Sequence, residues 1–211
     1  PLADGRALGR LPVLALTALL LAACSVPDPS VTPSAEPPPL ASRAPSAGEP
    51  SASEAADMCG RTDPTTQSGE VLVYFTCGTS PIAQPFPVVR SASGTSTDEL
   101  LEEALRELLA GPAADEQERG WRSWFSAATA DMLISATVTG GQATVDLADF
   151  SELIPNASTS AGRRQLLAEL QSTVFQFPEI ARLELRFNGS CLAFWSWLEN
   201  LRCEPLERPP G

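Results

Sequence analysis

Hydrophobic and polar residues repeat along this chain with two different periods, and the period distinguishes predicted strands from predicted helices. Gly140-Gly141 and Asn188-Gly189 are dipeptides that favour tight turns, so each is predicted to join two strands into a hairpin. Six segments are dense in β-branched and aromatic residues or alternate between apolar and polar, as strands do: 70–76, 86–90, 132–139, 142–147, 181–187 and 191–197.

Two other segments carry leucines three and four residues apart, which is the spacing of a helix with one buried face. The first begins at a capping box formed by Ser96 and Glu99 and ends at Gly111-Pro112. The second spans 161–175 and ends before Pro178. The predicted order is β-β-α-β-β-α-β-β. We therefore expect an α+β fold in which two helices pack on one mainly antiparallel sheet.

The N-terminal 23 residues have the pattern of a secretory signal. An apolar run over 11–23 follows Arg6 and Arg10, and Leu21 stands three places before Cys24, as bacterial lipoprotein processing requires. We predict that Cys24 receives a diacylglyceryl group and becomes the mature N-terminus. A transmembrane anchor is the alternative, but a run of 13 residues is shorter than the roughly 20 residues that span a bilayer.

Composition divides the rest of the chain. Residues 25–57 are rich in Pro, Ser, Ala and Glu and contain few large apolar side chains, so we expect a disordered stalk. The next 150 or so residues are enough for one domain with a hydrophobic core. The predicted division is a signal over 1–23, lipidated Cys24 and stalk over 24–57, a domain over 58–205 and a tail over 206–211.

Charge and composition exclude several classes of function. The chain has a formal net charge of −12 and contains neither histidine nor lysine. This excludes Ser-His-Asp and Cys-His nucleophiles, Schiff-base lysines and histidine zinc sites. The acidic balance argues against nucleic acid as a partner and against a polybasic contact with anionic lipid. We expect no cofactor and no metal, and membrane attachment through the acyl chains on Cys24.

Four cysteines remain if Cys24 is lipidated, and an oxidising extracytoplasmic setting favours two disulfides. Four cysteines allow three connectivities. We favour Cys59–Cys77 and Cys191–Cys203, because each closes a short local loop worth about 3 kcal/mol in the chain-entropy model. A metal site built from all four cysteines is the alternative, although the chain has no paired C-x-x-C motifs.

Trp121, Trp124 and Phe125 form the first candidate binding group. They follow the first predicted helix beside Arg119 and Arg122, and aromatic rings among arginines can stack on sugar or contact a partner protein. Packing beneath the sheet is the alternative for this segment.

Trp195 and Trp197 form the second candidate binding group. They lie two residues apart on a predicted strand, so they share one face of it. If Phe194 points to the core, both tryptophans point outward and form an exposed aromatic strip suited to binding.

Asp146 and Asp149 are the remaining catalytic possibility. A pair of carboxyl groups about 5–10 Å apart can hydrolyse glycosides, and peptidoglycan would be the substrate. The alternative is structural, with Asp146 at the end of a strand and Asp149 capping a turn.

Several phrases along the chain occur in an order that resembles a known family. They are Val71–Phe75 in the first strand, Leu108–Pro112 at the end of the first helix, Val145–Leu147 in the hairpin and Phe175–Pro178 after the second helix. Over roughly 70–190 this arrangement resembles the GerMN domain of spore-germination proteins and LpqB-like envelope lipoproteins. The resemblance implies an extracytoplasmic, non-enzymatic domain that assists envelope or sporulation complexes through protein contacts. It implies no catalytic residues.

We therefore expect a lipid-anchored binding or scaffolding module on the outer side of the cytoplasmic membrane, in contact with another envelope protein. The alternative is an envelope protein that binds or hydrolyses peptidoglycan.

Overall fold

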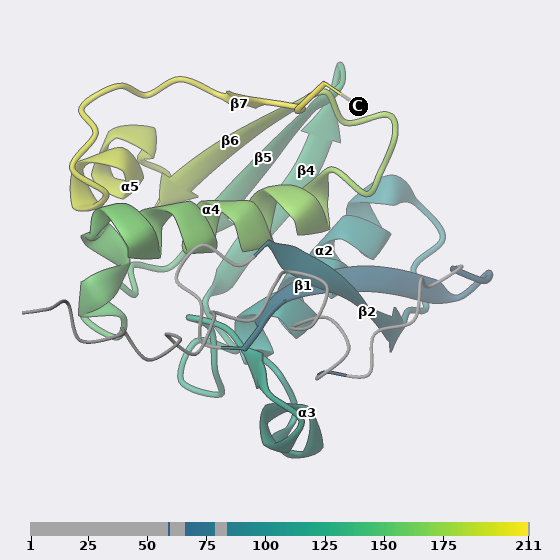
Figure 1. Cartoon of the computed structure of the whole chain (residues 1–211). Coiled ribbons are helices and arrows are strands. Elements are labelled where there is room, and N and C mark those ends of the chain that lie inside the picture. Colours follow the sequence, from purple (N-terminus) through teal and green to yellow (C-terminus); the bar gives the residue numbers. More distant parts are fainter. Residues whose placement is uncertain (1–58, 60–65, 79–83, 211) are drawn as a thin grey trace, which may run out of the picture. The chain divides into compact units, whose positions relative to one another are not determined.

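The computed structural model describes residues 59, 66–78 and 84–210 (Figure 1). The predicted signal, Cys24 and the predicted stalk lie outside these residues. Within the described ranges, no helix combines the length and the apolar character needed to cross a bilayer.

A small sheet is built around β1 (Glu70–Cys77), with β2 (Pro85–Ser91) antiparallel on one edge and β3 (Trp121–Arg122) on the other. Alternate β1 residues, Val71, Val73 and Phe75, are fully buried because this face lies against the helices. On the outer edge, prolines at both ends of the Pro85–Pro87 segment cannot donate hydrogen bonds. This discourages pairing of the β2 edge with another chain.

A second sheet has the order β4-β5-β6-β7. The β4–β5 hairpin is antiparallel and turns at Gly140-Gly141, where both residues have positive φ. β5 pairs with β6 in parallel, because the chain crosses over through the second long helix before it returns. β6 then pairs antiparallel with the short β7. The bounds are Leu133–Thr139 for β4, Gln142–Leu147 for β5, Arg182–Phe187 for β6 and Leu206–Glu207 for β7.

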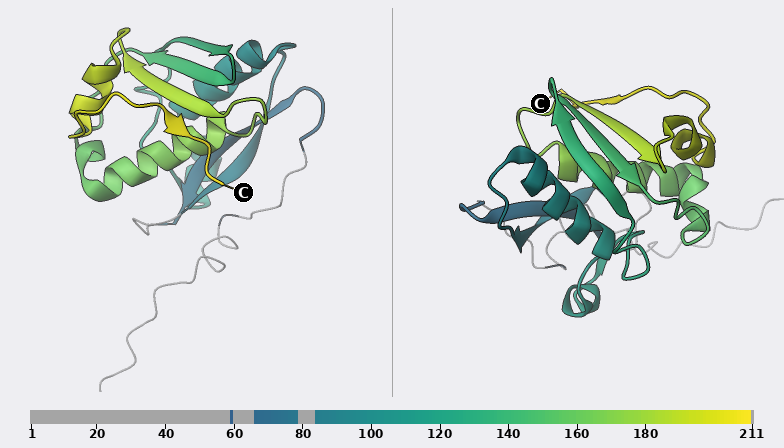
Figure 2. Two further views of the ribbon diagram at one scale, coloured as in Figure 1. Left: turned by 90° about the horizontal axis from the view of Figure 1, so that it is seen from above. Right: turned by 180° about the vertical axis from the view of Figure 1, so that it is seen from behind.

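Two long helices connect the sheets. α2 (Thr97–Ala110) packs against β1 and β4, and α4 (Ser160–Val174) packs against β1 and α2. Figures 1 and 2 show α4 lying across one face of β4–β6. The buried leucines of α2 and α4 join strand residues of both sheets in one hydrophobic core. The short helices are α3 (Ala114–Glu118), the 3-10 turn η1 (Pro155–Ser158) and α5 (Cys191–Trp197).

The capping box predicted for the first helix is present. The Ser96 hydroxyl accepts a hydrogen bond from the Glu99 backbone N–H, and the Glu99 carboxylate accepts one from the Ser96 backbone N–H at 3.0 Å. Hydrogen bonds from the backbone N–H groups of Thr95 and Ser96 lower the pKa of Glu99 to about 2. The carboxylate therefore stays ionised at the positive end of the helix dipole.

Gly111 ends α2 in a conformation that only glycine adopts readily, with φ 76° and ψ −179°. A Cβ atom there would lie 2.4 Å from the Phe125 carbonyl oxygen. We expect Gly111→Ala to destabilise the domain by on the order of 3 kcal/mol, measured from the urea midpoint. Gly140→Ala is the matched control, because Gly140 also has positive φ but no atom within 4 Å of the new Cβ. Equal losses in the two variants would contradict the role of the clash.

The α+β class is confirmed, and two details differ from our expectation. The strands form two sheets rather than one, and α2 packs against β1 of the first sheet and β4 of the second. The last predicted strand, 191–197, is helix α5: the Ser190 hydroxyl caps it by accepting a hydrogen bond from the Ala193 N–H. Its buried residues also repeat at helical spacing: Cys191, Phe194, Trp195 and Leu198.

The segment predicted as a tail is part of the fold. Leu206 and Glu207 pair with Leu183 and Arg182 of β6. Arg208 then reaches the connection between α4 and β6, where its guanidinium donates to the carbonyls of Phe175, Phe177 and Ile180. It also lies over the Phe175 ring, 5.2 Å from the centroid.

Candidate functional site

The two tryptophans of α5 belong to a cluster of aromatic rings. Trp195 is 4 % exposed, and Trp197 packs partly buried against the core. Neighbouring ring centroids are 5.0–5.9 Å apart, mostly edge to face, which is a favourable arrangement. The expectation of an outward-facing strip was therefore wrong, because a helix distributes residues 195 and 197 differently from a strand. The cluster comprises Phe125, Phe150, Phe187, Phe194, Trp195 and Trp197.

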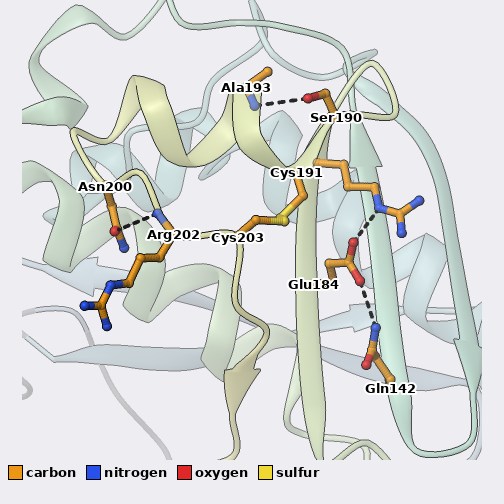
Figure 3. The surroundings of a disulfide bond; sticks show 9 residues. Gln142, Glu184, Ser190, Cys191, Ala193, Asn200, Arg202 and Cys203 are labelled. Carbon is orange, nitrogen blue, oxygen red and sulfur yellow. Dashed lines mark hydrogen bonds and ion pairs between the residues drawn. A yellow bond between two sulfur atoms is a disulfide. The ribbon is translucent and has the colours of Figure 1, made fainter.

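Leucines, rather than tryptophans, are exposed at this corner. Leu192 is 52 % exposed and Leu201 is 79 % exposed. Both lie in the loop that the Cys191–Cys203 disulfide closes around α5 (Figure 3). Arg163 of α4 donates to the Leu198 carbonyl and holds the other end of the short helix. We call Leu192 and Leu201 with this disulfide the α5 corner. No sequence period marked these leucines, because their exposure depends on how α5 is oriented.

The Trp121–Phe125 segment mainly contributes to packing. Trp121 and Phe125 are 4 % and 2 % exposed, and Trp124 is partly buried against the core. A cleft of about 550 Å³ lies beside them, also lined by Arg122 and Ser123. The Ser123 hydroxyl connects this segment to α4 by donating a hydrogen bond to Glu169. The structure thus favours the packing interpretation of these three aromatics.

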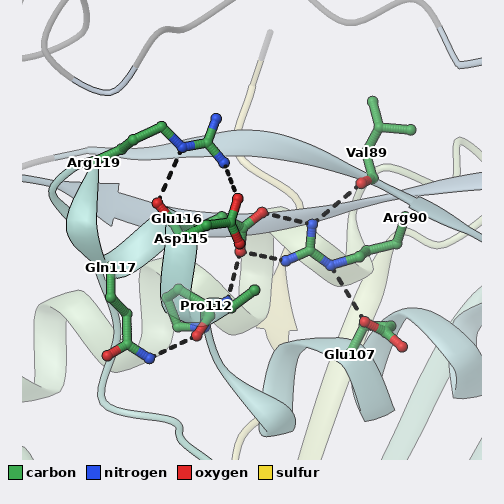
Figure 4. Close-up of polar contacts among 9 residues, drawn as sticks. Val89, Arg90, Glu107, Pro112, Asp115, Glu116, Gln117 and Arg119 are labelled. Atoms are coloured by element: carbon green, nitrogen blue, oxygen red, sulfur yellow. Dashed lines mark hydrogen bonds and ion pairs between the residues drawn. The ribbon is translucent and has the colours of Figure 1, made fainter.

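Arg90 fixes α3 to the small sheet beside this cleft (Figure 4). Its guanidinium forms two hydrogen bonds, of 2.9 and 2.6 Å, to the carboxylate of Glu116, which is 6 % exposed. A further ion pair of 3.2 Å joins it to Glu107 of α2. Bidentate pairing of this kind orients both partners, so the α3 segment has a defined position.

Each of the two candidate catalytic carboxylates accepts a backbone hydrogen bond. Asp146 accepts from the Gly189 N–H at 2.8 Å, across the turn that follows β6. Asp149 accepts from the Ser151 N–H at 2.9 Å, which is the turn cap that we considered as its alternative role. Both contacts are of a structural kind.

The cysteines pair as we favoured, Cys59 with Cys77 and Cys191 with Cys203. The first bond fixes Cys59 at the end of β1, with its Cα 6.2 Å from that of Cys77. The carboxylate of Glu184 lies near both sulfur atoms of the second pair. As a disulfide, these sulfurs are not the thiolates that a metal site requires.

Glu169 is a buried carboxyl group that we did not predict. It is fully buried on α4, where it accepts hydrogen bonds from the Ser123 hydroxyl at 2.6 Å and the Gln165 amide at 3.0 Å. Burial raises the pKa of Glu169 to about 8, although these hydrogen bonds and those from Thr76 act in the opposite direction. A signal was present in the sequence, since Glu169 lies between Leu166 and Leu170 on the apolar stripe of the helix.

Side chains at the end of α4 form hydrogen bonds with the edge of β1 that lies upstream of β3. β3 pairs with only the last two residues of β1, Thr76 and Cys77. Among the residues that the structure describes, no strand pairs with this edge of β1 upstream of Thr76. The Gln176 amide accepts from the Leu72 N–H at 2.7 Å and donates to the Leu72 carbonyl at 2.6 Å. The Thr173 hydroxyl accepts from the Tyr74 N–H at 3.2 Å. These bonds imitate a strand pairing and satisfy an otherwise unpaired edge.

A cleft of about 450 Å³, which we call the α4 cleft, lies where α4 meets β1 and β2. Tyr74 and Phe175 are its aromatic residues, and burial raises the pKa of the Tyr74 phenol. The remaining lining residues are Gln84, Pro85, Ala168, Gln171, Ser172, Gln176 and Pro209. None of these is acidic or basic, in contrast to the strongly acidic chain as a whole.

Comparison with known proteins gives one family and several solved structures. A family model described as sporulation and spore germination (Germane) matches residues 72–192. No curated protein matches the chain. The matched range ends within α5, so Cys191 and Leu192 of the α5 corner lie inside it, and Leu201, Cys203 and all of β7 lie beyond it.

The chain is similar to the tandem GerMN domains of the sporulation protein GerM from Bacillus subtilis, with 19 % identity and a TM-score of 0.47. That match covers 71 % of this chain and 49 % of the other, so the chain spans about half of the tandem structure. The first GerMN domain of the same protein matches with 18 % identity and a TM-score of 0.42, over 57 % and 84 % of the two chains. A Clostridium perfringens protein provisionally named a lipoprotein matches with 18 % identity and a TM-score of 0.39, over 70 % and 93 %.

Proposed function

The chain belongs to the Germane family of sporulation and spore-germination domains, and from this membership we propose a lipid-anchored, extracytoplasmic binding module of the bacterial cell envelope. The signal pattern before Cys24 supports the anchor and the side of the membrane. In this proposal the domain has no catalytic role and acts by holding another envelope protein.

The observation that carries the binding role is the α5 corner. Leu192 and Leu201 are two large apolar side chains left in solvent beside a disulfide. The disulfide and the Arg163 contact hold the corner in one conformation, which reduces the entropy lost when a partner binds. Exposed leucines on a rigid support are suited to contact an apolar pocket of a partner protein.

A non-enzymatic role is consistent with the positions of the acids. Asp146 and Asp149 accept hydrogen bonds from backbone N–H groups, and Glu169 is enclosed in the core. Hydrolysis of peptidoglycan by the Asp146–Asp149 pair is therefore the less favoured function.

Cross-linking in cells followed by affinity purification and mass spectrometry tests the proposal. We expect one dominant envelope protein to be captured by the parent chain and lost from the Leu192→Ser/Leu201→Ser variant. Ile134→Ser is the matched control, because Ile134 is 50 % exposed on β4, outside the corner. Cys24→Ser should remove the chain from the membrane fraction.

Two results would contradict the proposal. Undiminished capture by the double leucine variant would exclude the α5 corner as the contact surface. Sedimentation of the purified domain with cell-wall sacculi, without a captured protein, would favour peptidoglycan as the ligand instead.

A further inference from the structure

One face of α4 forms a wall of the α4 cleft. The residues of this wall are spaced three or four apart and therefore share a face of the helix: Ala168, Gln171, Ser172 and Phe175. The small sheet contributes Tyr74 of β1 and Pro85 of β2. The volume of about 450 Å³ lies within the range of roughly 300–1,000 Å³ that is usual for small-molecule sites. The cleft can therefore hold a small ligand or a short segment of a chain-like ligand.

Hydrogen bonds hold the walls of this cleft in place. The side-chain amide of Gln176 binds both the N–H and the carbonyl of Leu72, which fixes the end of α4 to β1. The Arg208 guanidinium donates to the Phe175 carbonyl, and the next residue, Pro209, lines the cleft. A preformed site loses less entropy when its ligand binds.

The polar groups of the cleft are uncharged. They are the hydroxyls of Tyr74 and Ser172 and the side-chain amides of Gln84 and Gln171. Among the described residues, none of these four groups has a hydrogen-bond partner. Hydroxyls and amides can both donate and accept, and burial raises the pKa of the Tyr74 phenol, so that it keeps its proton. A matching ligand is neutral and carries several groups that donate and accept.

The apolar surface of the cleft is centred on Tyr74. Phe175 is only 8 % exposed, and Arg208 covers one face of its ring, so Tyr74 offers the larger aromatic surface. Pro85 and Pro209 add rigid apolar surface. A sugar ring has an apolar C–H face and a rim of hydroxyl groups, so it can pack on an aromatic ring while its rim binds amides. An acetamido group adds an amide and a methyl group to the same unit.

We propose that the α4 cleft binds a neutral saccharide chain that contains N-acetylhexosamine units. Tyr74 supplies the surface on which a sugar ring packs, and Gln84 and Gln171 bind its hydroxyl and acetamido groups. An anionic glycan is disfavoured, because the lining has no basic residue and the chain carries a formal net charge of −12. The lining includes no residue of the α5 corner, so this inference does not rest on the proposed protein partner.

Tyr74 is the only tyrosine in the chain, so incorporation of 3-fluorotyrosine gives a single ¹⁹F NMR signal from the cleft. The experiment uses the chain from residue 24 onward, with Cys24→Ser so that no acyl chain is attached. We expect the tetramer of N-acetylglucosamine to shift this signal saturably. Cellotetraose, which lacks acetamido groups, should bind about fivefold more weakly for each lost hydrogen bond. A hyaluronan tetrasaccharide, in which every second sugar is acidic, should also bind more weakly.

Gln171→Ala removes one amide from the cleft and should weaken binding of the tetramer about fivefold. Alanine is a good helix former, so this variant should keep α4 intact. Gln67→Ala is the matched control, because Gln67 is an exposed glutamine outside the lining. The Leu192→Ser/Leu201→Ser variant should bind the tetramer as the parent does, which separates this test from that of the protein partner.

Four results would overturn the proposal. The first is the absence of a saturable shift with the tetramer, and the second is equal binding by Gln171→Ala and the parent, which would place the sugar outside the cleft. Loss of binding in the double leucine variant would assign the sugar to the α5 corner. Equal or tighter binding of cellotetraose or of the acidic tetrasaccharide would exclude a site for neutral N-acetylhexosamine.

Discussion

The free energy of unfolding of the domain is expected to fall as pH rises from 4.5 toward 8. An acidic side chain held by an ion pair has the opposite effect, because its contribution to stability rises with pH. Glu169 is the cause, because burial raises its pKa from 4.5 to about 8 in the folded chain. A group with a raised folded pKa contributes its full stability below the unfolded pKa, and this contribution is lost as pH rises through the folded pKa. The expected slope between these values is about 1.4 kcal/mol per pH unit.

The chain makes this measurement unusually direct. It contains no histidine, so no side chain of that type titrates in the same range. Urea unfolding at a series of pH values gives the slope, and Glu169→Gln should remove it while keeping the shape of the side chain. Exposed Glu152→Gln is the matched control and should keep the slope of the parent. A Glu169→Gln variant with an unchanged slope would show that another group is responsible.

Arg208→Ala is expected to destabilise the domain by about 2–4 kcal/mol, although the residue lies almost at the end of the chain. Its guanidinium satisfies the carbonyls of Phe175, Phe177 and Ile180 at the end of α4. Removal would leave the Phe175 and Ile180 carbonyls without this donor in a partly buried site, whereas the Phe177 carbonyl would keep the backbone N–H of Ile180 at 3.1 Å. The measured quantity is the free energy of unfolding in urea.

Arg208→Lys should recover only a minor part of the loss, because an ammonium group cannot reach three carbonyls in different directions as a planar guanidinium does. Exposed Arg202→Ala, whose side chain makes no such contact, is the control and should lie within about 0.5 kcal/mol of the parent. Full recovery by lysine would mean that charge rather than geometry matters at this position.

The local pattern predicted those elements whose structure depends on near neighbours. The helix that begins at Ser96, the Gly140-Gly141 hairpin and the strand at 70–76 were found at or within a few residues of their observed bounds. Each is defined by a cap, a turn or a dense apolar run, and such signals lie within a few residues of one another.

Features that depend on distant residues were not predicted. The Gln176 amide bonds to Leu72, which is 104 positions earlier, and no period in the sequence records that contact. α5 was misassigned because a short apolar run containing tryptophans is compatible with either period. Because of the same error, Trp195 was predicted to be exposed although it is buried. The exposed leucines of the α5 corner could be identified only from the fold.

The Cys59–Cys77 bond determines the route by which tension applied to the N-terminal side of Cys59 would enter the domain. Force would pass through the disulfide into the last residue of β1 and would bypass residues 60–69, which lie between the two points of attachment. Cys77 is also where β1 pairs with β3, and the neighbouring Thr76 pairs with both β2 and β3. The force would therefore reach the sheet where β1 has a strand on each side. A protease cut within residues 60–65 would for the same reason leave both fragments covalently joined, and the domain would stay attached to its N-terminal segment until the disulfide was reduced.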